Sequence, residues 1–305
     1  MIFKQREESA ELLSLRILNT RMRLTDKEKQ HYFNLKKGYE GEVLFDSMVD
    51  MLLSNCYILN DLLLKLNNTL FQIDKLIILP EANYFYEIKN NEGDFYYELR
   101  GLYLKNGSEV NNPLNQLNRS ESLLRQLLQN LKFNSPIHGS VVFVNPEFTL
   151  YQAPLNLPFI FPTQIHSLVR KLIMTTSKLN REHTFLAEKL RSLHIERSPY
   201  QTLPSYDFEQ LQKGISCRAC SSLATVIVGS RCVCKACGEN ESIETAVIRN
   251  VKEFQFLFPD RKITTNMIHE WCKIVESKKR IRTFLNKHFQ IVGVRQWAYY
   301  VEKGH

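Results

Sequence analysis

Residues 70–89 read LFQIDKLIILPEANYFYEIK, and this segment is the most informative part of the sequence. Apolar, β-branched and aromatic residues fill its two halves, and residues 80–83 supply a turn between them, so we expect two adjacent strands. Side chains alternate along a strand, which places Glu87 and Lys89 on one face. Asp74 interrupts the apolar first strand, where an uncompensated charge costs several kcal/mol. A divalent metal would compensate for that charge.

The charges of the second strand have a simpler interpretation. On the edge of an antiparallel sheet, Glu87 and Lys89 would form an ordinary solvated face. Two helical patterns favour a metal-binding site over this solvated face. Residues 38–45 open an amphipathic helix with Glu42 in its first turn, and residues 112–116 start another helix with a proline near its N-terminus.

The order of these elements and their motifs resembles the NERD domain, a nuclease-related domain of many bacterial proteins within the PD-(D/E)xK nuclease superfamily. The resemblance covers residues 38–165. Its matching motifs are Gly41-Glu42, Gln72-Ile73-Asp74, Glu87-Ile88-Lys89-Asn90, and Asn112-Pro113 with Gln116. The turn between the strands departs from the family pattern because it lacks a glycine, and Ser120 stands where a tyrosine is expected. The resemblance implies an α/β (α+β) fold with a restriction-endonuclease-like mixed sheet flanked by helices.

The resemblance also implies a nuclease that hydrolyses phosphodiester bonds of DNA with the help of Mg²⁺ or Mn²⁺. Its expected catalytic residues are Glu42, Asp74, Glu87, Lys89 and Gln116. The two strand carboxylates and the backbone carbonyl of Ile88 would bind Mg²⁺, which prefers oxygen ligands, and the helix glutamate would join them directly or through water. The lysine would position the attacking water or stabilise charge on the phosphate, while the glutamine would orient the site.

Two other classes of function stay open at this point. A DNA-binding adaptor could keep the nuclease fold without the chemistry, because a fold does not determine an activity. In a purely structural interaction protein, Asp74, Glu87 and Lys89 would have no chemical role, and their combination would be a coincidence. The enzyme is favoured because every charged position of the motif is present.

Composition indicates two or three globular domains, because 305 residues with 44% hydrophobic content can bury a sizeable core. No apolar run approaches the roughly 20 residues that span a bilayer, and the first residues lack the apolar core of a signal peptide. We therefore expect a cytoplasmic protein without a membrane partner. The net charge of +8 favours a polyanionic partner such as nucleic acid, and a homodimer stays open.

Two CxxC pairs form the second strong signal. Cys217 and Cys220 are followed, after thirteen residues, by Cys234 and Cys237. The intervening residues predict a hairpin with a tight turn, which returns the second pair to the first. Four thiolates can then surround one Zn²⁺ in a structural zinc ribbon. A redox CxxC would need only one pair, and Cys232 is a spare thiol that could compete for the metal.

The last sixty-odd residues predict three helices and a short hairpin, as in a winged-helix-like module. From Lys273 to Lys303, eight lysine or arginine residues stand against two glutamates, an excess of +6. A group of these opens the third helix, where a recognition helix would meet the DNA backbone. The group comprises Lys278, Lys279, Arg280 and Arg282. A basic solvated face that mediates protein contacts is an equal alternative.

The chain is expected to contain five regions in all. They are a helical N-terminal arm (1–37), the nuclease-like domain (38–165), a helical connector (166–210), the zinc ribbon (211–240) and the winged-helix-like module (241–305). Prolines at 199 and 204 mark the approach to the ribbon. No glycine-rich phosphate loop is present, which argues against a built-in ATPase motor.

Overall fold

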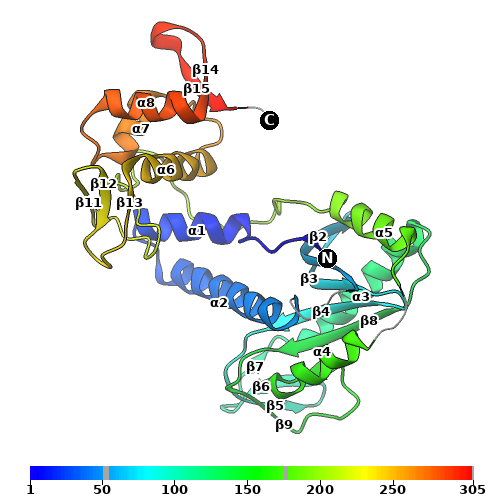
Figure 1. The fold of residues 1–305 in the computed structure, drawn as a ribbon. Coiled ribbons are helices and arrows are strands. Elements are labelled where there is room, and N and C mark those ends of the chain that lie inside the picture. Colours follow the sequence, from blue (N-terminus) through cyan, green and yellow to red (C-terminus); the bar gives the residue numbers. More distant parts are fainter. Residues whose placement is uncertain (51–54, 175–177, 304–305) are drawn as a thin grey trace. The chain divides into compact units, whose positions relative to one another are not determined.

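The computed structural model of the chain describes residues 1–50, 55–174 and 178–303 (Figure 1). The chain divides into two compact units, and each of the three buried apolar clusters belongs to one unit. The first unit comprises Met1–Ala10 and Phe33–Tyr200, and the second comprises Glu11–Tyr32 and Gln201–His305.

The first unit is built around a six-stranded mixed sheet of order β1-β2-β3-β4-β8-β10. Its strands are β1 (Ile2–Lys4), β2 (Tyr57–Leu66), β3 (Thr69–Ile78), β4 (Asn83–Lys89), β8 (Ile137–Phe143) and β10 (Phe159–Ile160). Strands β2, β3 and β4 are antiparallel neighbours, whereas β8 runs parallel to β4. The two strands expected from residues 70–89 are thus confirmed as β3 and β4. They lie in the middle of the sheet, which rules out the solvated edge strand.

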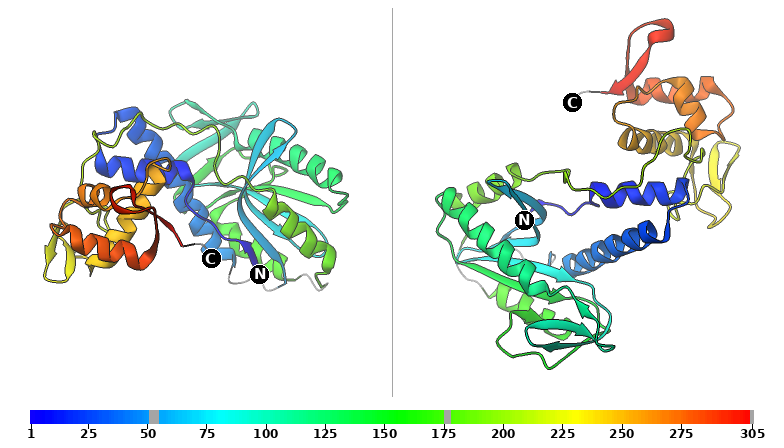
Figure 2. Two further views of the ribbon diagram at one scale, coloured as in Figure 1. Left: turned by 90° about the horizontal axis from the view of Figure 1, so that it is seen from above. Right: turned by 180° about the vertical axis from the view of Figure 1, so that it is seen from behind.

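Helices cover both faces of this sheet (Figure 2). One face packs on α3 (Pro113–Asn130) and α5 (Arg181–Ser192), whose leucines join side chains of β2, β3 and β8 in one buried cluster. The other face packs on the C-terminal part of α2 (Asp26–Val49) and on α4 (Ile165–Ile173). The mixed sheet flanked by helices, expected for a nuclease-like fold, is confirmed.

A smaller sheet belongs to the same unit. Its strand order is β7-β6-β5-β9, with β5 (Gly93–Glu98), β6 (Gly101–Leu104), β7 (Glu109–Val110) and β9 (Phe148–Tyr151). Phe95 and Phe148 project from it into the same buried cluster as α3, with ring centroids 5.2 Å apart. A 3-10 turn (Pro162–Gln164) then leads into α4.

The N-terminal segment differs from the helical arm expected over residues 1–37. Residues Ile2–Lys4 form a strand, β1, that pairs in parallel with β2, and the amino group of Met1 donates to the Cys56 carbonyl at 2.6 Å. Helix α1 (Ala10–Arg21) follows, and α2 begins at Asp26 rather than near Gly38. Most residues between Asp26 and Gly38 are charged or polar, so the first turns of α2 show little of the apolar periodicity that predicts a helix.

The second unit combines α1, the cysteine-rich segment and the C-terminal helices around one core. Its further elements are β11 (Thr225–Val228), β12 (Arg231–Cys234), β13 (Asn240–Ser242), α6 (Ile243–Leu257), α7 (Thr265–Cys272), α8 (Lys278–His288), β14 (Phe289–Val292), a 3-10 turn (Arg295–Trp297) and β15 (Tyr299–Glu302). Trp271 is fully buried and packs on Phe208 and Phe254. The three helices and terminal hairpin follow the expected order, but they share their core with the cysteine-rich strands.

Each C-terminal helix begins at a residue whose side chain caps it. Ser242, Thr264 and Ser277 precede α6, α7 and α8, and each hydroxyl accepts a hydrogen bond from a backbone N–H of the first turn. Short loops and strong caps therefore fix this module locally. Among the helices that the structure describes, none is long and apolar enough to cross a membrane.

Candidate active site and cysteine cluster

Strands β3 and β4 bring the predicted motif residues together. The buried Asp74 carboxylate accepts a hydrogen bond from the backbone N–H of Ile88 at 2.8 Å, which ties it to β4. Glu87 Oε1 accepts from Lys89 Nζ at 2.6 Å, and the same Nζ donates to Gln116 Oε1 of α3 at 3.2 Å. Glu87 and Lys89 therefore lie on one face of β4, as alternation predicts, with the α3 glutamine beside them.

The alternation of side chains along β3 shifts at Asp74. Ile73 and Leu76 belong to the same buried cluster although they are three residues apart. On β2, Asp61 lies between the residues that pair with Ile73 and Lys75, and its φ of 51° is in the left-handed region. Irregular positions of this kind re-aim side chains near functional sites. Here two consecutive charged residues are buried, since Asp74 is 6% exposed and Lys75 is 0% exposed.

Helix α2 supplies a third carboxylate, from Glu42. Burial, together with the negative charge of Asp74, raises the pKa of Glu42 to about 8. Burial likewise raises the pKa of Glu87 to about 7, and it raises the pKa of Asp74 against the opposing charge of Lys89. Desolvation thus favours the neutral form of all three carboxyl groups, whereas a bound cation would favour their ionised form.

Gly41 lets α2 approach the end of β4 closely. A Cβ atom on this glycine would lie 2.5 Å from the Cβ atom of Asn90, the residue after Lys89. The Asn90 side chain donates to the Lys37 carbonyl of α2 at 2.8 Å, which fastens the same contact. The glycine before Glu42 therefore has a steric role: it brings the helix near enough to place that carboxylate at the site.

Arg6 is a residue of the site that sequence reasoning missed. Its guanidinium donates to Glu42 Oε2, to Asp46 Oδ2 at 2.7 Å and to the backbone carbonyl of Asp74 at 2.7 Å. Its side chain is 3% exposed. The residue follows β1, and the pairing of β1 with β2 carries it to the sheet. No local signal marked it, because it lies in an ordinary charged N-terminal segment.

A second buried cation was also missed. Lys75 Nζ donates to Asp46 Oδ1 at 2.8 Å, to Asp50 Oδ1 at 2.5 Å and to Asn60 Oδ1 at 2.9 Å. Asp46 thereby connects Lys75 to Arg6. Here the sequence did contain a signal, since a lysine directly after Asp74 in an apolar strand needs buried partners as much as the aspartate does.

The charges of this network fit a divalent cation. Its five carboxylates are those of Glu42, Asp46, Asp50, Asp74 and Glu87, and its three cations are Arg6, Lys75 and Lys89. Five negative and three positive charges leave an excess of negative charge when every group is ionised, and the nearby charge of Asp61 adds to it at Glu42 and Asp74, so a divalent cation would be stabilised there. The donors are hard oxygens, the type that Mg²⁺ and Mn²⁺ prefer.

The four predicted cysteines of the second unit meet in one cluster. The Sγ atoms of Cys217, Cys220, Cys234 and Cys237 all lie within 4.8 Å of one another, and two of the pairs are 3.6 Å apart. Tetrahedral zinc with Zn–S bonds of about 2.3 Å requires S···S distances of about 3.8 Å, so the cluster is compatible with a zinc ribbon. Antiparallel β11 and β12, joined by a two-residue turn, bring the pairs together.

Both CxxC turns hold their thiols in the same way. The N–H of Ser221 donates to the Cys217 carbonyl, and the N–H of Gly238 donates to the Cys234 carbonyl, each at 3.0 Å. Burial opposes ionisation of Cys234, but backbone N–H groups of Cys237 and Ala236 lower the pKa of its thiol to about 7. Amides aimed at a sulfur favour the thiolate, which is the form that binds metal.

Cys232 lies outside the cluster. It is 3% exposed and belongs to the apolar core of the second unit, and burial raises the pKa of its thiol. Cys232 and Cys234 are two residues apart and so share one face of β12, but Cys234 lies at the end of the strand, where the second cysteine pair begins. The structure therefore separates the spare thiol from the four clustered ones.

The basic residues expected to contact DNA lie on α8. Lys278, Lys279 and Arg282 are exposed, while Ile281 turns into the core. Arg280, the fourth of the group, is half-buried in the first turn of the same helix. They form a basic surface of one element, separate from the cysteine cluster.

The fold and the carboxylate–lysine site define a nuclease-like domain, and a comparison with protein families gives it a name. Residues 37–144 match the family NERD, the nuclease-related domain, so this part of the chain is a nuclease-related domain. The match begins within α2 and ends just after β8, and it includes Glu42, Asp74, Glu87 and Lys89. No match was found among curated proteins or among solved structures.

Proposed function

We propose that this protein is a metal-dependent nuclease that hydrolyses phosphodiester bonds of DNA at the site formed by Asp74, Glu87 and Lys89. The observation that supports this most is that the carboxylates of Asp74 and Glu87 are buried on two central strands of a nuclease-related domain, with the half-buried Lys89 paired to Glu87. Isolated buried charges are costly, and a chain that did not use them would gain by losing them.

Each residue has a role in this reaction. Asp74 and Glu87, with the backbone carbonyl of Ile88, hold Mg²⁺ or Mn²⁺, and Glu42 joins them directly or through water. The bound ion would polarise the phosphate and lower the pKa of a bound water. Lys89, anchored by Glu87 and by Gln116, positions the attacking water or stabilises charge that develops on the phosphate.

The second unit provides structure and nucleic-acid contacts in this proposal. Zn²⁺ held by the four clustered cysteines stabilises the short β11–β13 sheet, which is too small to fold alone. The exposed cations of α8 contact the phosphate backbone, as the recognition helix of a winged-helix module does. Their contribution is tested by Lys279→Glu, which should weaken DNA binding and reduce its salt dependence.

A catalytically silent DNA-binding adaptor is the second candidate. Arg6 favours it, because this buried guanidinium donates to Glu42 and to the Asp74 backbone and so compensates part of the negative charge without any metal. The adaptor and the enzyme differ in what happens to DNA after it binds.

The deciding experiment is cleavage of supercoiled and linear plasmid DNA by the purified protein with Mg²⁺ or Mn²⁺, alongside Lys89→Ala. We expect metal-dependent nicking by the natural protein and a loss of at least about a hundredfold in the variant. DNA binding by both proteins, measured in parallel, should be similar. Binding without cleavage by either protein would favour the adaptor.

A further inference from the structure

The second unit contains a cavity of about 290 Å³ that the nuclease site does not use. Three elements form it: α1, the loop with the first cysteine pair, and α6. Pockets for small ligands begin at about 300 Å³, so the volume of this cavity lies at the lower end of that range and suits one small ligand, no larger than a single nucleotide. Its chemistry is decided by the charges that line it.

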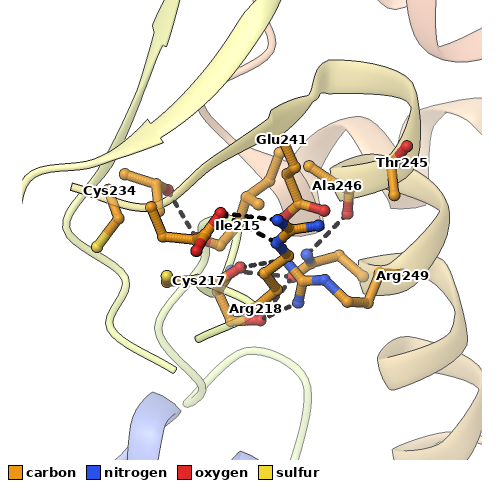
Figure 3. Close-up of polar contacts among 12 residues, drawn as sticks. Ile215, Cys217, Arg218, Cys234, Glu241, Thr245, Ala246 and Arg249 are labelled. Atoms are coloured by element: carbon orange, nitrogen blue, oxygen red, sulfur yellow. Dashed lines mark hydrogen bonds and ion pairs between the residues drawn. The ribbon is translucent and has the colours of Figure 1, made fainter. Parts of the chain in front are cut away.

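A balanced ion network forms one wall. Arg249 Nη2 donates to Glu241 Oε1 at 2.6 Å, and Nη1 donates to Ser216 Oγ at 2.9 Å (Figure 3). Arg249 thus links α6 to β13 and to the residue just before the first cysteine pair. Glu253, which also lines the cavity, accepts from fully buried Arg21 at 3.0 Å. Two arginines thus meet two glutamates, so the charges of this network balance.

Three further cations line the cavity beyond this network. They are Arg16 of α1, Arg218 between the first two cysteines and Lys252 of α6. The exposed Arg218 also pairs with the half-buried Glu239, which lies outside the cavity lining. The lining as a whole has four cationic side chains and one carboxylate, so its surplus charge is positive and favours an anion.

The same cavity has an apolar side. Leu13 and Ile17 come from α1, and Phe256 comes from α6. Aromatic side chains stack on nucleobases, and arginine or lysine side chains bind phosphate oxygens. Surplus positive charge next to an aromatic and aliphatic surface is the combination that a nucleotide requires.

We propose that this cavity binds one nucleotide, with its phosphate at Arg16, Arg218 and Lys252 and its base against Phe256. The nucleotide is either free or the phosphorylated end of a single strand, because both have the same chemistry. The inference rests on the proposed nucleic-acid partner and is independent of hydrolysis at Glu87 and Lys89.

The test measures binding of a probe to the zinc-loaded protein of 305 residues without other added divalent metal. The probe is a short thymidine oligonucleotide with a 5′-phosphate and a 3′ fluorophore, followed by anisotropy. Arg16→Glu and Lys252→Glu should each weaken binding by at least about tenfold, the loss expected for a charge-assisted contact. The matched control is Arg23→Glu, a reversal of an exposed arginine just after α1 and outside the cavity lining, and it should change affinity by less than about twofold.

Two competition experiments distinguish a free nucleotide from the phosphorylated end of a strand. Displacement of the probe by thymidine monophosphate assigns the site to a free nucleotide, and displacement only by the 5′-phosphorylated strand assigns it to a strand end. Failure of every probe to bind, or equal losses in the cavity variants and in Arg23→Glu, would overturn the proposal. Because Lys252 is exposed, Lys252→Gln should fold normally and should still weaken binding of the probe. A loss of affinity in this variant cannot then be attributed to misfolding. Lys89→Ala should bind the probe with normal affinity. A loss of binding at the cavity can therefore be distinguished from a loss of cleavage at the nuclease-like site.

Discussion

Buried charges at the nuclease-like site are compensated one by one, and Arg6 is the clearest case. The side chain comes from the first residues of the chain and contacts carboxylates of α2 and the backbone of β3. Removing one partner of a buried ion pair leaves the other charge desolvated. Arg6 therefore stabilises the sheet and also holds the Glu42 carboxylate in position.

Arg6→Ala should lower the free energy of unfolding by about 3 kcal/mol, because Glu42 and Asp46 would lose a buried partner. Urea denaturation measures this change. Arg6→Lys should recover part of the loss, since lysine keeps the charge but not the forked contact. A loss below about 1 kcal/mol, the range of exposed pairs, would contradict this role.

The raised pKa of Glu42 predicts a pH dependence. The folded protein holds this proton up to about pH 8, whereas the unfolded chain releases it near the ordinary value of 4.5. The folded state therefore binds more protons between these values, and the stability that Glu42 contributes is complete below 4.5 and is lost as the pH rises through about 8.

The measurement compares the natural protein with Glu42→Gln by urea denaturation without added Mg²⁺. The difference in free energy of unfolding, natural protein minus variant, should fall between about pH 5 and about pH 9. Saturating Mg²⁺ should reduce that fall, because a bound cation favours the ionised carboxylate. A difference that grows with pH would show that Glu42 is ionised throughout.

Sequence reasoning found some residues of the site and not others. Asp74, Glu87 and Lys89 were predictable because charges in apolar strands are unusual and form a motif with fixed spacing. Asp46 and Arg6 were not, because a charged residue in a helix or a terminal segment is normally solvated. Their burial depends on a strand pairing across more than fifty residues, which no local pattern contains.

At the scale of elements, the contact between α2 and β4 controls the site. Gly41→Ala should destabilise the protein by about 1–3 kcal/mol, because the new Cβ atom would lie 2.5 Å from Asn90. The same shift should move Glu42 and reduce cleavage. Thermal and urea denaturation measure the first effect, and the plasmid assay measures the second.

The same helix provides the control. Gly38 also lies within α2, but a Cβ atom there would meet nothing within 4 Å. Gly38→Ala should therefore leave cleavage unchanged and stabilise the protein by up to about 1 kcal/mol, the gain expected for alanine in a helix. Equal effects of the two substitutions would argue against a close-approach role for Gly41.

The cysteine-rich strands depend on their metal in this account. Cys220→Ser should abolish stoichiometric zinc binding and lower the unfolding temperature of the second unit, because β11–β13 share its core. Cys232→Ser should keep about one zinc per chain, since that thiol lies outside the cluster. Elemental analysis and calorimetry distinguish these outcomes. Zinc retained by Cys220→Ser would exclude it as a ligand.

The elements themselves differ in how far the sequence predicted them. Strands β3 and β4, helix α3 and the β11–β12 hairpin were foreseen because each has its own turn, cap or alternation. Strand β1 and the start of α2 were missed, since β1 has three residues and the first turns of α2 are nearly all polar. Short strands that are stabilised by their neighbours leave little pattern in the sequence.

For the whole molecule, composition and motifs predicted separate modules, and the structure groups them differently. The cysteine-rich strands, α1 and the three C-terminal helices share one core, although α1 is about two hundred residues from the others. Such long-range packing follows from tertiary contacts that periodicity does not reveal. The basic cavity is a product of this grouping, because α1 provides one of its sides.

In the proposed nuclease, Asp74 and Glu87 hold a divalent cation in the first unit. Anomalous diffraction from crystals soaked in Mn²⁺ tests it most directly, with Glu87→Gln as the comparison. We predict a manganese peak in contact with both carboxylates of the natural protein and its loss in the variant. A saturated crystal without a peak at these residues, or a peak that persists in Glu87→Gln, would contradict the claim.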